Sequence, residues 1–119
     1  MEYENNVIAA KSFEFAKRMV NLNKYLASDK KEYVLSRQIL KSGTSIGANV
    51  FEAQNAQSNM DFLSKMKIAL KEATETMYWL MLLYETDYIT ESAFDSLKLE
   101  LDDIRNILGA ICKTTAESN

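Results

Sequence analysis

The chain has 119 residues, of which 47% are hydrophobic and 26% are charged, and it contains three glycines and no proline. This length predicts one domain with one core, and the scarcity of turn-forming residues excludes an all-β design, so we expect an all-α protein. The net charge is −3 and histidine is absent, which removes the usual general base and the usual transition-metal ligand. The single Cys112 has no partner for an internal disulfide and is expected in the core.

Apolar residues spaced alternately four and three positions apart predict four helices, at roughly residues 6–27, 30–55, 59–86 and 91–114. The buried stripe of the first helix is expected at Ile8, Ser12, Phe15, Met19, Leu22 and Leu26. The second stripe is expected at Leu35, Ile39, Ser42, Ile46, Asn49 and Ala53. The last two are expected at Leu63, Met66, Leu70, Ala73, Met77, Leu80 and Tyr84, and at Leu97, Leu101, Ile104, Leu108 and Ile111.

The short polar connections between these stripes contain residues that favour helix N-termini. Asp29 followed by Glu32 is typical of a capping box, and Ser58 followed by Asp61 is a looser version of it. Thr90 is expected to cap the fourth helix. Connections this short place neighbouring helices antiparallel, so the sequence predicts a single domain over residues 1–119, an up-down-up-down four-helix bundle.

Two glycines lie four residues apart inside the second predicted helix, beside its buried stripe. Gly43 and Gly47 each lower helix stability by about 1 kcal/mol relative to alanine. Such a cost is tolerated where a missing side chain lets another helix approach closely, within the chain or in a second copy. A well-packed helix could equally tolerate the glycines without any such approach, so both interpretations stay open here.

The same helix carries a polar strip beside its apolar stripe. Its members are Gln38, Ser45, Asn49 and Glu52. Asn49 lies about 60° from the centre of the stripe on a wheel of 100° per residue, so we expect its amide to be half-buried and hydrogen-bonded. We favour a structural pairing for this amide over ligand binding.

The third helix has a second apolar face opposite its stripe. Ile68, Trp79 and Leu82 cluster there around Glu75, and Leu83 is expected to flank them. A tryptophan with aliphatic neighbours on an exposed face is typical of a partner-binding surface, and we interpret it as an oligomer interface. Smaller sets of the same kind occur on the first two helices, at Phe13 and Val20 and at Tyr33 and Phe51.

Two segments resemble one protein family. Residues 38–53, QILKSGTSIGANVFEA, resemble the pattern Gln-x-Arg-Arg-x-x-x-Ser-Ile-x-x-Asn-Ile-x-Glu-[Gly/Ala] of the bacterial four-helix bundle proteins encoded in 23S rRNA intervening sequences, also called S23-type proteins. Residues 69–80, ALKEATETMYWL, are similar to the Ala-Leu-Lys-Glu-x-x-Glu-Thr-x-Tyr-Trp-Leu segment of one branch of that family. The resemblance covers nearly the whole chain.

The resemblance implies an up-down bundle, commonly assembled as a homopentamer, with no established enzyme chemistry. The positions carried over, none with an assigned reaction, are Ser45, Ile46, Asn49, Val50 and Glu52, and Glu75, Tyr78 and Trp79. Together with the second apolar face, they give the expected oligomer-interface residues Ile68, Glu75, Tyr78, Trp79 and Leu82. Leu40 and Lys41 stand where many relatives have two arginines, which argues against strong RNA binding.

The sequence therefore favours a non-catalytic homo-oligomer, pentameric by resemblance, that acts as a scaffold or partner-binding protein. The alternative is an RNA- or DNA-binding protein, because residues 1–71 carry 11 Lys/Arg against 7 Asp/Glu, whereas residues 72–119 carry 3 against 10. The cations singled out for this role are Lys17, Lys24, Arg37 and Lys41. We expect no enzyme activity, catalytic residue, cofactor, metal or small-molecule ligand.

We also expect a cytoplasmic location without membrane contact. The chain has no run of eighteen apolar residues, and its first residues, MEYENNV, lack the basic and then apolar pattern of a signal peptide.

Overall fold

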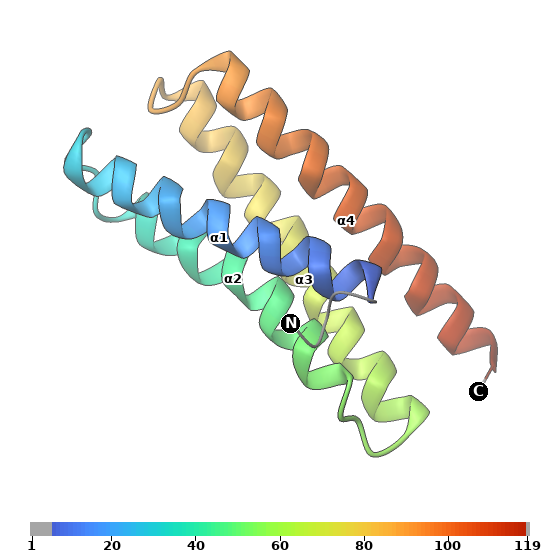
Figure 1. The fold of residues 1–119 in the computed structure, drawn as a ribbon. Helices are drawn as coiled ribbons and strands as arrows, with labels where there is room; N and C mark the ends of the chain where they lie inside the picture. The colour runs from blue at the N-terminus through green and yellow to red at the C-terminus, as the bar shows by residue number, and fades with distance from the viewer. Residues whose placement is uncertain (1–5, 119) are drawn as a thin grey trace.

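The computed structural model describes residues 6–118, which form four α-helices and no strand. The helices are α1 (Val7–Ser28), α2 (Leu35–Ala53), α3 (Asn59–Glu85) and α4 (Glu91–Ser118). Consecutive helices run in opposite directions (Figure 1), with α1 against α2 and α4, and α3 against the same two helices. The protein is therefore all-α, as the sequence predicts, and its helices form an elongated up-down bundle of 46 × 26 × 23 Å.

The apolar stripes form one continuous core between the helices. In α1, all six residues of the predicted stripe are buried, and Phe15, Met19 and Leu26 are completely inaccessible. In α4 the stripe is also buried as predicted, except that Cys112 takes the last buried position and Ile111 is only half-buried. The core position of Cys112 agrees with the sequence prediction.

The buried side of α2 is rotated relative to the predicted stripe. Leu35 and Asn49 are half-buried, whereas Ser36, Gly43 and Val50 are buried. The rotation has a simple cause, since α2 packs against both α1 and α3 and so buries a wider arc than one stripe.

Two of the three predicted N-caps are confirmed. The Ser58 hydroxyl accepts a hydrogen bond of 3.0 Å from the Asp61 amide at the start of α3. The Thr90 hydroxyl accepts one of 3.1 Å from the Ala93 amide at the start of α4. Each hydroxyl satisfies one of the amides that the first turn of a helix leaves without an intrahelical partner.

The predicted capping box at Asp29 is wrong, and α2 begins at Leu35 rather than near residue 30. The Asp29 amide donates to the Tyr25 carbonyl at 2.9 Å, so Asp29 ends α1 instead of starting α2. The cap of α2 is the Glu32 carboxylate, which accepts from the amides of Leu35 and Ser36 at 3.2 and 3.0 Å. Both the capping residue and the first residue of α2 therefore lie later in the chain than predicted. α4 also extends further than predicted, to Ser118.

The two glycines of α2 lie where α1 packs against it. A Cβ atom on Gly43 would overlap the Met19 side chain, with Sδ only 2.6 Å away. A Cβ atom on Gly47 would lie 3.2 Å from the Ser12 carbonyl oxygen of α1. Of the two interpretations of these glycines, close approach of a helix within the same chain is the one that the structure supports.

A buried pair of hydroxyls joins α2 to α3. The Ser42 and Thr76 hydroxyl oxygens are 2.9 Å apart, and Thr76 Oγ1 also lies 2.7 Å from the Glu72 carbonyl. A carbonyl can only accept, so Thr76 donates to Glu72 and accepts the proton of Ser42. This arrangement satisfies both hydroxyls inside the core.

The turns from α1 to α2 and from α3 to α4 lie at the same end of the bundle (Figure 1). Each contains one residue in the left-handed region that is not glycine, Lys31 with φ 54° and Asp87 with φ 68°. At the second turn, the Tyr88 amide donates to the Leu83 carbonyl and the Asp87 amide to the Tyr84 carbonyl, which closes the C-terminus of α3. Within residues 6–118 no helix has the length and apolar character needed to cross a membrane.

Candidate functional site

The polar strip of α2 lies along its border with α3. At the end of the strip, the Glu52 carboxylate lies 4.0 Å from the Lys65 ammonium of α3. Asn49 is half-buried and its amide donates to the Ser45 carbonyl at 2.8 Å, while the Ser45 hydroxyl donates to the Lys41 carbonyl at 2.7 Å. These two side chains therefore bond to their own helix. Gln38 is exposed, whereas Ile46 of the family pattern is completely buried.

The outer row of α3 consists of Ile68, Glu75, Tyr78, Trp79 and Leu82. Tyr78 is 60% exposed and Ile68 is 40% exposed, while Trp79 and Leu82 are half-buried. The Trp79 indole packs against the core, meets the Tyr78 ring edge-on at 5.0 Å, and donates from Nε1 to the Glu75 carboxylate at 3.2 Å. The row therefore presents aromatic surface to solvent with a carboxylate held beside it.

Leu83 does not belong to this row, contrary to the sequence prediction. Its side chain is completely buried. Successive residues of a helix are 100° apart, and the step from Leu82 to Leu83 moves the side chain from the outer surface to the buried column of Ala69 and Thr76. The apolar surface outside α3 is narrower than predicted for that reason.

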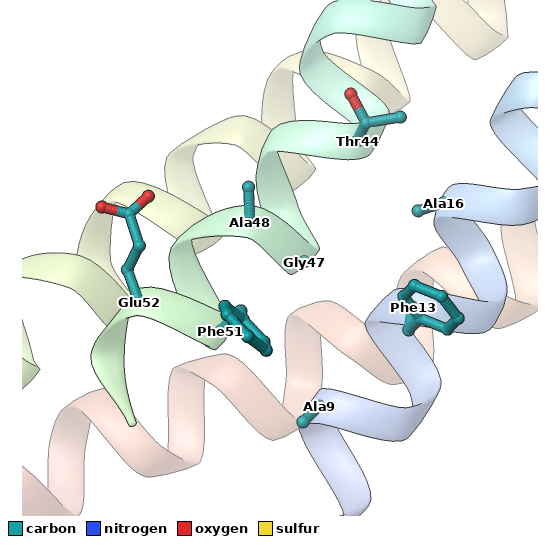
Figure 2. Close-up of a pocket in the computed structure, with 8 residues that line it drawn as sticks. All are labelled: Ala9, Phe13, Ala16, Thr44, Gly47, Ala48, Phe51 and Glu52. Atoms are coloured by element: carbon teal, nitrogen blue, oxygen red, sulfur yellow. The ribbon is translucent and has the colours of Figure 1, made fainter. Parts of the chain in front are cut away.

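An apolar groove runs between α1 and α2 on the outside of the bundle. It has a volume of about 390 Å³ and is lined by Ala9, Phe13 and Ala16 of α1, and by Thr44, Gly47, Ala48, Phe51 and Glu52 of α2. Figure 2 shows Phe13 and Phe51 on opposite sides of the groove, with Gly47 between the two helices and Glu52 pointing away from α1. Gly47 lies against the Ser12 backbone of α1, so the two helices approach closely beside the groove.

The four cations singled out from the sequence lie on α1 and α2, and none of them lines the groove. Lys17 and Lys24 follow Phe13 by one and three helical turns, and Arg37 and Lys41 precede Thr44 by two turns and one turn, so they lie between the groove and the α1–α2 turn. All four are exposed. The Lys17 ammonium lies 5.7 Å from the centre of the Phe13 ring and 2.8 Å from Glu14. We call these four residues the α1–α2 cations.

Titratable groups elsewhere show two perturbed pKa values. The pKa of Tyr84 is raised, first by the negative charge of Glu91 and then by burial and by the carboxylates of Glu85, Asp95 and Asp87. Burial raises the pKa of the Cys112 thiol, against a smaller opposing effect of Lys67. Within the described part of the chain, no three His, Cys, Asp or Glu residues are grouped so that they could hold a metal ion.

Sequence reasoning found the α3 row but not the groove as a unit. Phe13 and Phe51 were assigned to two separate apolar sets, on two different helices. The missing signal was the pairing of small residues, since Ala9 and Ala16 on α1 face Gly47 and Ala48 on α2. A stretch of small residues on each of two adjacent helices, next to an exposed aromatic, indicates a groove between them.

Comparison with known proteins identifies the family. Residues 4–110 match the family model of the 23S rRNA-intervening sequence protein. A search of curated proteins finds no match. Among solved structures, the chain is similar to a protein of unknown function from the S23 ribosomal protein family of Bacteroides thetaiotaomicron VPI-5482, determined at 1.70 Å resolution. The two share 53% sequence identity with a TM-score of 0.88, over 89% of this chain and 98% of the other. The chain belongs to the 23S rRNA-intervening sequence protein family.

Proposed function

We propose that the protein is a non-catalytic, homo-oligomeric four-helix bundle that serves as a scaffold or partner-binding protein. The observation that carries the proposal is the outer row of α3, in which Tyr78 is 60% exposed beside the half-buried Trp79 and Ile68 is 40% exposed. Contiguous exposed aromatic surface is uncommon on a monomer and typical of an interface. The number of copies, five, and a cytoplasmic location are the finer parts of the proposal, and the number comes from the family resemblance.

A measurement of native mass tests the assembly. At micromolar concentration, light scattering or native mass spectrometry is expected to give about five times the chain mass of 13.6 kDa. Running the same sample with and without cellular RNA separates a protein ring from a ribonucleoprotein. A single species of 13.6 kDa at this concentration would contradict the proposal.

A second candidate function is nucleic-acid binding, and the α1–α2 cations favour it. Lys17 lies 5.7 Å from the centre of the Phe13 ring, and Lys24, Arg37 and Lys41 are exposed on the same two helices. Cations beside aromatic rings are groups that bind single-stranded nucleic acid. Binding to rRNA fragments should then weaken steeply between about 50 and 200 mM salt, because phosphate contacts release counterions. Affinity that is absent, or that does not change with salt, would argue against this function.

A further inference from the structure

The connection between α1 and α2, together with the adjoining ends of both helices, concentrates positive charge. Residues 24–37, which we call the basic turn, contain two acidic residues and four basic ones. The basic residues are Lys24, Lys30, Lys31 and Arg37, and all four are exposed. This local excess of positive charge contrasts with the net charge of −3 of the whole chain.

The carboxylates of the basic turn are occupied by other groups. Asp29 accepts a hydrogen bond from the neighbouring serine hydroxyl, and Glu32 caps α2. Six cations elsewhere in residues 6–118 lie within 4.0 Å of a described carboxylate, whereas none of the four in the basic turn does. The six are Lys11, Lys17, Arg18, Lys65, Lys98 and Arg105. The positive charge of the turn is therefore available to an anion from outside the chain.

Two tyrosines are exposed among these cations. Tyr25 and Tyr33 are 38% and 52% exposed. The Lys30 ammonium lies 6.0 Å from the centre of the Tyr25 ring. Arg37 donates from Nε to the Tyr33 carbonyl at 3.0 Å, which holds its guanidinium beside the turn. Each tyrosine is thus accompanied by a cation.

Exposed aromatic rings among unpaired cations suit a single-stranded nucleic acid, because bases stack on the rings while the cations neutralise neighbouring phosphates. We propose that the basic turn binds a single strand of RNA or DNA in this way. The inference rests on the nucleic-acid function given above as the second candidate, and adds where the strand lies and how it is held. Tyr33, the more exposed ring, is the stacking residue, and Lys30 and Lys31 contact phosphates.

The other turn at the same end of the bundle disfavours a flat anionic partner such as a bilayer. The α1–α2 and α3–α4 turns lie at one end (Figure 1). The α3–α4 turn and the helix ends beside it carry the exposed carboxylates of Glu85, Asp87, Glu91 and Asp95. A broad anionic surface facing this end would meet them, and like charges repel. The basic turn also offers one exposed aliphatic residue, Val34, which is too little apolar surface for stable membrane anchoring. A single strand is narrow enough to follow the α1–α2 turn alone.

Fluorescence anisotropy with a labelled single-stranded RNA of about twelve nucleotides tests the proposal. The charge variant carries Lys30→Gln and Lys31→Gln. The matched control carries Lys67→Gln and Lys71→Gln, which remove the same charge from exposed lysines of α3 that also have no described carboxylate within 4.0 Å. Tyr33→Ser removes the stacking ring, and Tyr33→Phe keeps it.

The charge variant should bind more weakly, and its plot of log affinity against log salt should be less steep by about 1.4, since each phosphate contact of a single strand contributes about 0.7. The control should keep the wild-type affinity and slope. Tyr33→Ser should weaken binding about tenfold without changing the slope, because the ring carries no charge. Tyr33→Phe should bind like the wild type.

Circular dichroism melting verifies that each variant is folded. Lys30→Gln alone, with Lys67→Gln as its control, replaces a charge variant that is not folded, and its slope should change by about 0.7. Tyr33→Leu, which keeps an apolar side chain without an aromatic ring, replaces an unfolded Tyr33→Ser.

The outcomes separate this inference from the nucleic-acid function itself. A wild type that binds the RNA, with a charge variant and Tyr33→Ser that bind equally well, overturns the inference and leaves the function standing. A wild type that does not bind the RNA removes the function, and the inference with it. A duplex of the same sequence that binds as tightly as the single strand, with no effect of Tyr33→Ser, overturns the stacking of bases on the turn.

Two further measurements test the other partners that a basic turn could have. Phosphatidylserine vesicles that bind the wild type and not the charge variant would assign the turn to a membrane surface. A charge variant that loses the native mass of the wild-type assembly would assign the turn to a contact between copies. Either result overturns the inference, and vesicles that do not bind, with an unchanged native mass, support it.

Discussion

Gly43, Gly47 and Gly109 occupy helices of the same chain in three different surroundings. A Cβ on Gly43 would overlap Met19, and one on Gly47 would press on the Ser12 carbonyl, whereas one on Gly109 would meet nothing within 4 Å. Replacing any of the three glycines with alanine gains about the same helix propensity, roughly 1 kcal/mol. Differences in stability between the three alanine variants therefore report the local packing.

We therefore expect Gly109→Ala to stabilise the protein by about 1 kcal/mol. Gly43→Ala should be less stable than Gly109→Ala by about 1 to 3 kcal/mol, because Met19 has to repack inside the core. Gly47→Ala should lie between them. Urea unfolding of the three variants measures these differences, and equal stabilisation by all three would contradict the close approach of α1 to α2.

The thiol of Cys112 is expected to react slowly. It is 8% exposed, and its raised pKa keeps it protonated where an ordinary thiol begins to ionise. Folding favours the neutral thiol, because its pKa is higher in the folded than in the unfolded chain. The thiol's contribution to stability is therefore present at neutral pH and is lost as the pH rises through its folded-state pKa. A chromogenic disulfide reagent at pH 8 should react at least about tenfold faster with the protein unfolded in guanidinium. Equal rates would show that the thiol is accessible.

At the scale of elements, the start of α2 depends on one carboxylate. Glu32→Ala removes the acceptor for the amides of Leu35 and Ser36, and the loss of such a cap costs about 0.5 to 2 kcal/mol. Asp29→Ala is the control, because the Asp29 side chain accepts from Ser28 and caps no amide of α2. Thermal melting should show the larger decrease for Glu32→Ala. A larger decrease for Asp29→Ala would instead support the capping box that the sequence predicts at Asp29.

The elements show what periodicity can predict and what it cannot. The stripe of α1 was fully predictable, because one face of a helix is apolar and its spacing is regular. The start of α2 was not, because Asp29 and Glu32 are both good capping residues and only the left-handed turn at Lys31 decides which of them is used. The polar strip was likewise only partly predictable. The half-burial of Asn49 followed from its angle on the helix, but its hydrogen bond to the Ser45 carbonyl did not.

At the scale of the whole molecule, α1 and α4 form the most open side of the bundle. They pack less closely than the other neighbouring pairs, and two hollows of about 290 and 250 Å³ lie between them. Two ion pairs cross this side, Lys11 with Asp103 at 2.7 Å and Arg18 with Glu100. Charged groups therefore provide part of the contact that apolar packing provides elsewhere.

Removing both carboxylates from this side should have a modest effect that depends on salt. Glu100→Gln with Asp103→Asn is expected to lower the free energy of unfolding by about 0.5 to 2 kcal/mol, since each partly exposed pair contributes up to about 1 kcal/mol. The difference from wild type should shrink in about 1 M salt, where screening is strong. Glu117→Gln, near the end of α4, is the control and should have little effect. A loss that does not change with salt would assign the effect to packing.

The arrangement of surfaces around the bundle could be predicted only in part. The apolar row on α3 followed from one helix, because Ile68, Trp79 and Leu82 share a face of it. The groove could not be predicted in this way, because it depends on how α1 and α2 are rotated relative to each other. That rotation depends on the close contact at Gly47, and the periodicity of either helix alone does not reveal it.

Lys31 and Asp87 place side chains in a backbone region that costs a residue with a Cβ atom about 1 to 2 kcal/mol. Glycine relieves this cost and adds back some freedom to the unfolded chain, so Lys31→Gly should raise the melting temperature slightly. Asp87→Gly should gain less, because aspartate enters this region more readily than lysine. Calorimetry of the two variants would show whether one exposed loop residue already limits how much heat this bundle withstands.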